Sequence, residues 1–136
     1  MSAKNNLEIA QGFLSKIAAG ASGEDVASLF SNDLDWNIPG SSGALPWVGR
    51  KSGKQAVVDF VNESPKLIER LRFNIQDVLA GDRRAVILGD LATRVNNTGK
   101  VIESAFAIVL TVDHGLITHF LMLEDSFCVA QATSVN

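Results

Sequence analysis

The stretch FAIVLTVDHGLITHFLMLED, residues 106–125, decides the fold of this chain. Two apolar runs rich in β-branched and aromatic residues flank the short polar segment Asp113-His114-Gly115. Glycine adopts the positive φ angle that a tight hairpin turn requires, and β-branched residues favour strands. The stretch therefore predicts two antiparallel strands joined by a short turn.

Similar runs precede this hairpin, back to about Leu67. They are LRFNIQDVLAG (residues 71–81), RRAVILGDLATRV (83–95) and KVIESAFAIVLTV (100–112). Glycine with asparagine or aspartate separates the runs, and Asn96-Asn97-Thr98-Gly99 predicts the turn between the last two. We therefore expect four consecutive strands in an antiparallel meander.

The start of the chain has helical spacing instead. Apolar residues recur at this spacing from Leu7 to Ala18, and Gly20 follows as a stop signal. Ser22, three residues before Asp25, predicts the N-cap of a short second helix.

The segment between the helical start and the meander is mixed. Residues 33–38 alternate between polar and apolar side chains, which predicts a strand, and residues 41–53 are expected to form a long loop. Ser52 and Gln55 resemble a capping box, which predicts a third helix that stops before Ser64-Pro65. Helices first and a meander last define an α+β fold, with helices packed on one face of a curved sheet.

The composition fits one globular domain over residues 1–136, with 46% apolar residues, 20% charged residues and a formal net charge of −3. The single cysteine, Cys128, cannot form an internal disulfide, which favours a reducing cytoplasm. No stretch approaches the ~18 consecutive apolar residues of a membrane span, and weak acidity argues against nucleic acid. We therefore expect a cytoplasmic domain with neither a membrane nor a nucleic-acid partner.

The order of these elements resembles that of a known superfamily. VASLFSNDLDWNIPG (residues 26–40), PWVGRKSGKQAVVDFV (46–61) and the final hairpin resemble ketosteroid isomerase, SnoaL-like polyketide cyclases and nuclear transport factor 2. The resemblance covers nearly the whole chain. It implies a cone-shaped, curved antiparallel sheet with the N-terminal helices on its concave face, and a deep pocket for a small-molecule ligand between them. This superfold hosts enzymes, binding proteins and assembly modules alike.

The catalytic residues of those enzymes are absent at the matching positions. Ile38 takes the place of the base of ketosteroid isomerase, Ala107 takes the place of its oxyanion-binding aspartate, and the chain contains no tyrosine. Met122 takes the place of the aspartate base of SnoaL-type cyclases and limonene epoxide hydrolases. The resemblance therefore argues against steroid isomerisation by the known mechanism, because an aliphatic side chain accepts no proton.

Strand alternation suggests other pocket residues. The position matching the family's aspartate points inward, which turns Glu103 inward on the same strand and Asp90 and Arg94 inward on the preceding one. We predict these three as catalytic candidates: Asp90 or Glu103 acts as general base, and Arg94, expected to pair with Glu103, positions a polar substrate or stabilises an enolate. The alternative is a structural salt bridge at the pocket mouth. The predicted ligand-binding residues are Trp36, Ile38, Trp47, Leu88, Ala107, Phe120, Met122 and Glu124.

Other polar residues have simpler interpretations. His119 lies on the strand face opposite Phe120 and, with Leu121 and Leu123, predicts a homodimer through that face. Asp125 predicts a helix N-cap, although it also matches an aspartate of many SnoaL-like sequences, and Cys128 is expected to be buried filler. Five basic residues interspersed with glutamates predict a solvated surface: Lys51, Lys54, Lys66, Arg70 and Arg72.

Metal-ligand spacing and a phosphate-binding glycine loop are absent from the sequence, so we expect neither a metal nor a cofactor. Two hypotheses for the function remain. The first is an enzyme that uses a pocket carboxylate for isomerisation, cyclisation or hydrolysis of an apolar ring compound. The second is a non-catalytic ligand-binding or dimeric accessory protein.

Overall fold

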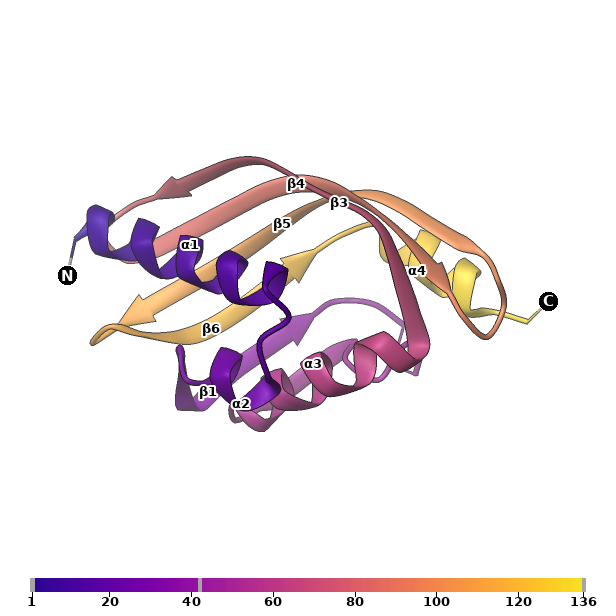
Figure 1. Ribbon diagram of the computed structural model, residues 1–136, viewed down its shortest axis with the longest axis horizontal. Helices are drawn as coiled ribbons and strands as arrows, with labels where there is room; N and C mark the ends of the chain where they lie inside the picture. The colour runs from indigo at the N-terminus through magenta and orange to yellow at the C-terminus, as the bar shows by residue number, and fades with distance from the viewer. Residues whose placement is uncertain (1, 42, 136) are drawn as a thin grey trace.

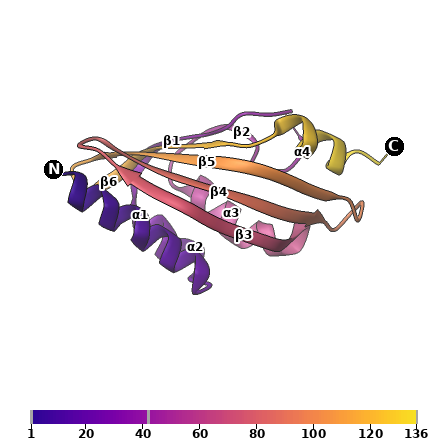
Figure 2. The ribbon, with the colours of Figure 1, turned by 90° about the horizontal axis from the view of Figure 1, so that it is seen from above.

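The computed structural model describes residues 2–41 and 43–135. The elements are, in chain order, α1 (Ala3–Ala18), α2 (Gly23–Ala27), β1 (Phe30–Ile38), β2 (Gly49–Ser52), α3 (Gln55–Leu67), β3 (Ile68–Ala80), β4 (Arg84–Val95), β5 (Val101–Asp113), β6 (Leu116–Leu123) and α4 (Ser126–Thr133). Figure 1 looks onto the face of the sheet that α1, α2 and α3 cover, which we call the inner face. The opposite side is the outer face, and α4 lies at the end of the sheet farthest from the N-terminus (Figure 2).

The strands form one open, curved sheet in the order β2-β1-β6-β5-β4-β3. The predicted meander is present, and the α+β architecture with helices on one face is confirmed. The sheet is mixed rather than wholly antiparallel, because β1 lies parallel to β6. The predicted loop also contains β2, an edge strand whose side chains are mostly exposed and so carry no apolar alternation.

The helix ends follow local hydrogen bonding. The hydroxyl of Ser22 accepts a hydrogen bond from the backbone N–H of Asp25 at 3.1 Å, which confirms the predicted cap of α2. The predicted capping box of α3 is wrong, because Ser52 belongs to β2 and the helix begins without a side-chain cap. This helix also runs past Pro65 to Leu67, since a proline near a helix end costs one hydrogen bond and only a short final turn follows it.

Aromatic side chains fill the space between the helices and the inner face. The rings of Trp36 and Phe120 stack with centroids 4.4 Å apart, and Phe60 of α3 lies 5.8 Å from Trp36. Phe13 of α1 meets Phe30 edge to face at 5.9 Å. These rings form the centre of the hydrophobic core, in the region where the resemblance implies a deep pocket.

A bulge in β6 determines which side chains of the meander face inward. Val112 pairs with Ile117 and Thr111 with His119, so Thr118 is an extra residue in β6. Past the bulge, Ile108 rather than Ala107 pairs with an inward residue of β6, Met122. Paired residues on neighbouring strands point to the same face of the sheet. The bulge in β6 therefore reverses the predicted inward and outward residues of β5, and through β5 those of β4.

Two further bulges lie in β3. Arg70 pairs with Thr93 and Arg72 with Ala92, so Leu71 is an extra residue, and a second irregularity follows Ile75. Leu71 is consequently 43% exposed. Its neighbour Arg70 faces inward with Thr93, whose side chain is buried.

Candidate functional site

Three polar side chains share one region of the inner face. Arg70 comes from β3, Thr93 from β4, and Glu124 follows β6 directly, on the face that Phe120 and Met122 occupy. The guanidinium of Arg70 donates a hydrogen bond from Nη1 to the hydroxyl oxygen of Thr93. The charges of Arg70 and Glu124 act on each other, so the two groups are electrostatic neighbours.

Arg70 is held in a defined orientation but remains accessible. Its guanidinium carbon lies 5.3 Å from the ring centroid of Phe73, which stacks on Phe106 at 4.9 Å. The residue as a whole is exposed to solvent. Desolvation lowers the pKa of Arg70, and the nearby Glu124 opposes that shift. An arginine nevertheless stays charged in proteins, so this region carries a permanent cation.

Glu124 is an acid in an environment that favours its proton. Burial raises the pKa of its carboxyl, and the positive charge of Arg70 offsets part of that rise. Across residues 2–41 and 43–135, no hydrogen bond or salt bridge occupies its carboxylate oxygens. The group is therefore available to exchange a proton or to bind a ligand.

The raised pKa of Glu124 predicts a pH-dependent stability. The folded chain keeps this proton where the unfolded chain has released it, so stability falls as pH rises from the unfolded pKa through the folded pKa. Glu124→Gln should therefore increase the free energy of unfolding relative to wild type at neutral pH and leave it nearly unchanged below about pH 4. Urea titrations at the two pH values measure the difference.

Asp90 provides a control of opposite sign. The pKa of Asp90 is lowered, chiefly by the hydrogen bond from Arg72 and next by the one from Asn74. The contribution of Asp90 to folding stability is therefore present at neutral pH and is lost as the pH falls. Asp90→Asn should destabilise the protein at neutral pH and have little effect in acid. If the free energy of unfolding depended on pH in the same way for Glu124→Gln and Asp90→Asn, the opposite pKa shifts described for the two carboxyl groups would be wrong.

The structure corrects the placement of five predicted site residues. They lie on the outer face because of the bulge at Thr118: Leu88, Asp90, Arg94, Glu103 and Ala107. The predicted ion pair between Arg94 and Glu103 is also wrong, because Arg94 donates to Glu69 on β3 at 2.9 Å. Asp90 accepts hydrogen bonds from Arg72 at 2.7 Å, from Gln76 at 3.0 Å and from Asn74 at 3.3 Å. These partners differ from those of the predicted salt bridge, and the catalytic role of these residues stays a prediction.

The other predicted ligand-binding residues, apart from Glu124, belong to the packed interior. All are at most 7% exposed: Trp36, Ile38, Trp47, Phe120 and Met122. The indole N–H of Trp36 donates to the carbonyl oxygen of Trp47 at 2.9 Å, and Trp47 meets Phe60 edge to face at 5.3 Å. Their side chains cover one another, so they expose little surface to a ligand, and their binding role stays a prediction.

Arg70 and Thr93 are the site residues that the sequence analysis missed. The mixture of basic residues and glutamates around Arg70 predicts a solvated surface, and regular alternation in residues 69–73 would likewise turn Arg70 outward. The bulge at Leu71 breaks this alternation without a glycine or proline to announce it. Thr93 gave no signal, since a threonine in a strand is ordinary.

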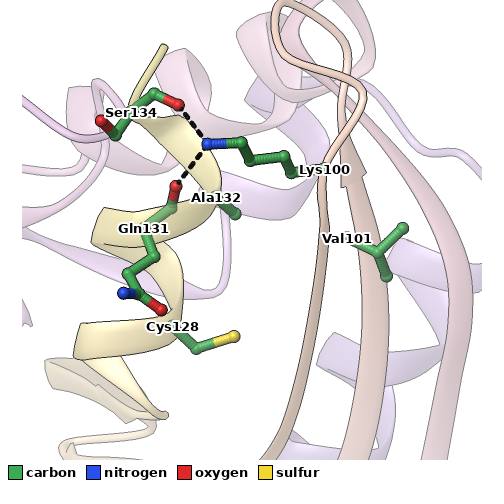
Figure 3. A pocket seen from close by; sticks show the side chains of 6 residues that line it. All are labelled: Lys100, Val101, Cys128, Gln131, Ala132 and Ser134. Atoms are coloured by element: carbon green, nitrogen blue, oxygen red, sulfur yellow. Dashed lines mark hydrogen bonds between the residues drawn. The ribbon is translucent and has the colours of Figure 1, made fainter. Parts of the chain in front are cut away.

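Two hollows lie away from this region. One of about 540 Å³ borders α3 and β2 and is lined by residues that include Trp47, Lys51 and Glu63. The other, of about 400 Å³, separates α4 from the start of β5 (Figure 3). Lys100 binds the carbonyl oxygens of Gln131 and Ser134 there, at 3.4 and 2.7 Å. Cys128 borders this second hollow and is half-buried rather than fully buried as expected.

The C-terminal helix, α4, begins with a side-chain cap. The carboxylate of Asp125 accepts a hydrogen bond from the N–H of Cys128 at 3.0 Å, which confirms it as the N-cap of α4. No group of three or more His, Cys, Asp or Glu side chains in the described part of the chain is arranged to hold a metal ion. Within the same residues, no helix combines the length and the apolar character needed to cross a membrane.

Known proteins share this arrangement of elements. An NTF2-like protein from Burkholderia xenovorans has a TM-score of 0.86 and 22% identity, over 98% of this chain and 99% of its own. A candidate isomerase from Rhodopseudomonas palustris has a TM-score of 0.68 and 22% identity, over 80% and 81% of the two chains. A candidate SnoaL-like polyketide cyclase from Mesorhizobium loti has a TM-score of 0.70 and 15% identity, over 85% and 96%. At these identities the likeness concerns the fold alone.

No curated protein matches the chain. The family model described as a SnoaL-like domain, however, matches residues 10–120, which is most of its length. The protein therefore belongs to the SnoaL-like domain family.

Proposed function

We propose that this protein binds a small ring-shaped molecule beside Arg70, Thr93 and Glu124, and that Glu124 exchanges a proton with a carbon atom of that molecule. One observation carries the proposal. Glu124 is a carboxyl group on the inner face whose pKa is raised by burial and whose oxygens are free of internal hydrogen bonds. A general base needs a pKa near the pH at which it works and oxygens that can reach the substrate, and Glu124 has these properties.

The chemistry follows from the two charged groups. Glu124, once ionised, removes a proton from a carbon next to a carbonyl group; the electron pair of the C–H bond forms a C=C bond, and the π pair of the carbonyl group moves to its oxygen. The N–H groups of Arg70 that Thr93 does not use can stabilise the enolate. Return of the proton from Glu124 to another carbon isomerises the substrate. Alternatively, the enolate carbon attacks a second carbonyl group and closes a ring, and the alkoxide formed there takes the proton from Glu124. The names of the related structures, a candidate isomerase and a candidate cyclase, agree with this class of reaction.

Deuterium exchange tests the proton transfer without knowledge of the natural substrate. The ketone 2-tetralone, an apolar ring compound with acidic C–H bonds beside its carbonyl, is incubated in D₂O and followed by proton NMR. We expect the protein to accelerate exchange over buffer, and Glu124→Gln to lower the accelerated rate by about 10²- to 10⁴-fold.

The matched control is Asp90→Asn, which removes a carboxylate from the outer face and should leave the exchange rate unchanged. If exchange depends on Asp90 instead, the catalytic role predicted from the sequence is correct and the assignment to Glu124 fails. If the wild-type protein binds ring compounds without accelerating exchange, the chain is a ligand-binding protein. The apolar side chains of Ile38, Ala107 and Met122 favour this second candidate.

We propose that the protein forms a homodimer through the outer face. We also propose that it works in the cytoplasm. This face carries His119, Leu121 and Leu123, and α1 to α3 leave it uncovered (Figure 1). Leu123 is 45% exposed. The flanking charges are neutralised within one copy, by pairs such as Arg72 with Asp90, so a second copy meets little charge repulsion.

Substitution of the apolar residues should disrupt this dimer. The double variant Leu121→Glu and Leu123→Glu should behave as a monomer in light scattering, because it would place four like charges in a two-fold interface. Leu79→Glu is the control, since Leu79 is exposed but lies near the end of β3, at the edge of the sheet. A wild-type protein that is monomeric at micromolar concentration would refute the dimer.

A further inference from the structure

The arginines of the sheet differ in their partners. Arg50 and Arg72 are paired with carboxylates at 3.2 and 2.7 Å, and Arg94 is paired at 2.9 Å, all on the outer side. Arg70, on the inner face, has no carboxylate within 4.0 Å in the described part of the chain. A guanidinium has five N–H donors, and Thr93 accepts from only one of its nitrogens. Most of the binding capacity of Arg70 is therefore left for a ligand.

The surroundings of Arg70 favour a carboxylate ligand with an apolar part. The buried hydroxyl of Thr93 and the ring of Phe73 fix the guanidinium, so little side-chain entropy is lost when a ligand binds. A fixed guanidinium matches the two oxygens of a carboxylate through parallel hydrogen bonds. Phe73 is only half-buried beside the guanidinium, so the exposed part of its ring can contact an apolar group attached to the carboxylate.

Charge limits the ligand further. Glu124 interacts electrostatically with Arg70, so an anion bound to Arg70 is repelled by Glu124 when that carboxyl is ionised. The guanidinium balances the single charge of a monocarboxylate, whereas a second charge on the ligand would have no cation to balance it and would add to the charge of Glu124 whenever that group is ionised. We infer that the site takes a monocarboxylate with an apolar group attached, with Arg70 as the residue that binds its carboxylate. This inference rests on the proposed function, since it names the substrate class of the same site.

Titration with simple probes tests the inference. Benzoate, its uncharged analogue benzamide and the dianion phthalate are added to ¹⁵N-labelled protein, and the amide signals of Thr93 and Glu124 and the Nε–H signal of Arg70 are followed by NMR. We expect saturable shifts of these signals with benzoate and weaker binding of both other probes. Benzamide binding as tight as benzoate, or no shift with benzoate, would overturn the inference.

Variants identify the residue responsible. Arg70→Gln should weaken benzoate about 10- to 100-fold and leave benzamide unaffected, because it removes a charged hydrogen bond. Arg70→Lys keeps the positive charge but loses the paired N–H donors of the guanidinium, so its affinity for benzoate should lie between those of Arg70→Gln and wild type. This variant replaces Arg70→Gln if the glutamine variant folds poorly. Arg72→Gln is the matched control, since Arg72 lies on the same strand but on the outer face, and it should bind benzoate as wild type does. Equal weakening by Arg72→Gln would assign benzoate to a non-specific electrostatic effect.

The outcomes separate this inference from the proposed function. Benzoate binding that depends on Arg70, without Glu124-dependent exchange on 2-tetralone, would support the ligand class and refute the proton transfer. Glu124-dependent exchange with no preference for benzoate over benzamide would support the proton transfer and refute the ligand class.

Discussion

Replacing Gly89 with alanine should lower the free energy of unfolding by about 3 kcal/mol or more, because this position of β4 has no room for a side chain. A Cβ atom there would overlap the carbonyl oxygen of Asn74 on β3 and lie 2.8 and 2.9 Å from the ring of Phe106. The ring is itself stacked on Phe73, so it cannot move aside freely. Relief would require β3 and β4 to separate.

Urea unfolding measures this effect, and Gly12→Ala is the control. Gly12 lies inside α1, and an added Cβ atom meets nothing within 4 Å there. Alanine should stabilise that helix by roughly 0.5–1 kcal/mol, since glycine is the more flexible residue in the unfolded chain. A Gly89→Ala protein that unfolds at the same urea concentration as wild type would show that β3 and β4 are not packed as described.

Replacing Trp36 with alanine should cost about 3–5 kcal/mol, the usual range for deleting a large buried aromatic side chain. Trp36 is 1% exposed, stacks on Phe120 and contacts Phe60 of α3. It also donates to the carbonyl oxygen of Trp47, so it links β1 to the loop before β2. Its removal would leave a cavity between the sheet and the helices.

Trp36→Phe separates ring packing from the hydrogen bond. This variant keeps an aromatic ring against Phe120 but leaves the buried carbonyl group of Trp47 without its donor, which costs roughly 1–3 kcal/mol. Thermal unfolding of both variants should give a clearly smaller loss for phenylalanine. Two equal losses would mean that ring packing contributes little, contrary to the stacked geometry.

The parts of the fold that local chemistry determines could be predicted from the sequence. The turn at Asp113-His114-Gly115 contains the positive φ angles that glycine permits, at His114 as well as at Gly115. Ser22 and Asp125 cap their helices as expected, because a hydroxyl or carboxylate satisfies the free N–H groups of a first turn wherever the helix lies.

The candidate site could be predicted only in part. Glu124 was included because alternation along β6 beyond the bulge is regular, with Phe120 and Met122 on the same face. Arg70 and Thr93 were missed, since their placement depends on the extra residue Leu71. A bulge depends on pairing between strands and leaves no signature in the order of polar and apolar residues. One unseen extra residue at Thr118 likewise moved Asp90 and Glu103 to the wrong face.

The irregularities of β3 have a consequence for the behaviour of the protein at high concentration. β3 forms an edge of the sheet and is 13 residues long, and a straight edge strand of that length invites another chain to add to it. The bulges at Leu71 and after Ile75 divide this edge into short pieces, and charged side chains such as Arg72 and Asp77 point away from the core along it. The departure from regular pairing that turns Arg70 inward thus also protects the chain from aggregating edge to edge.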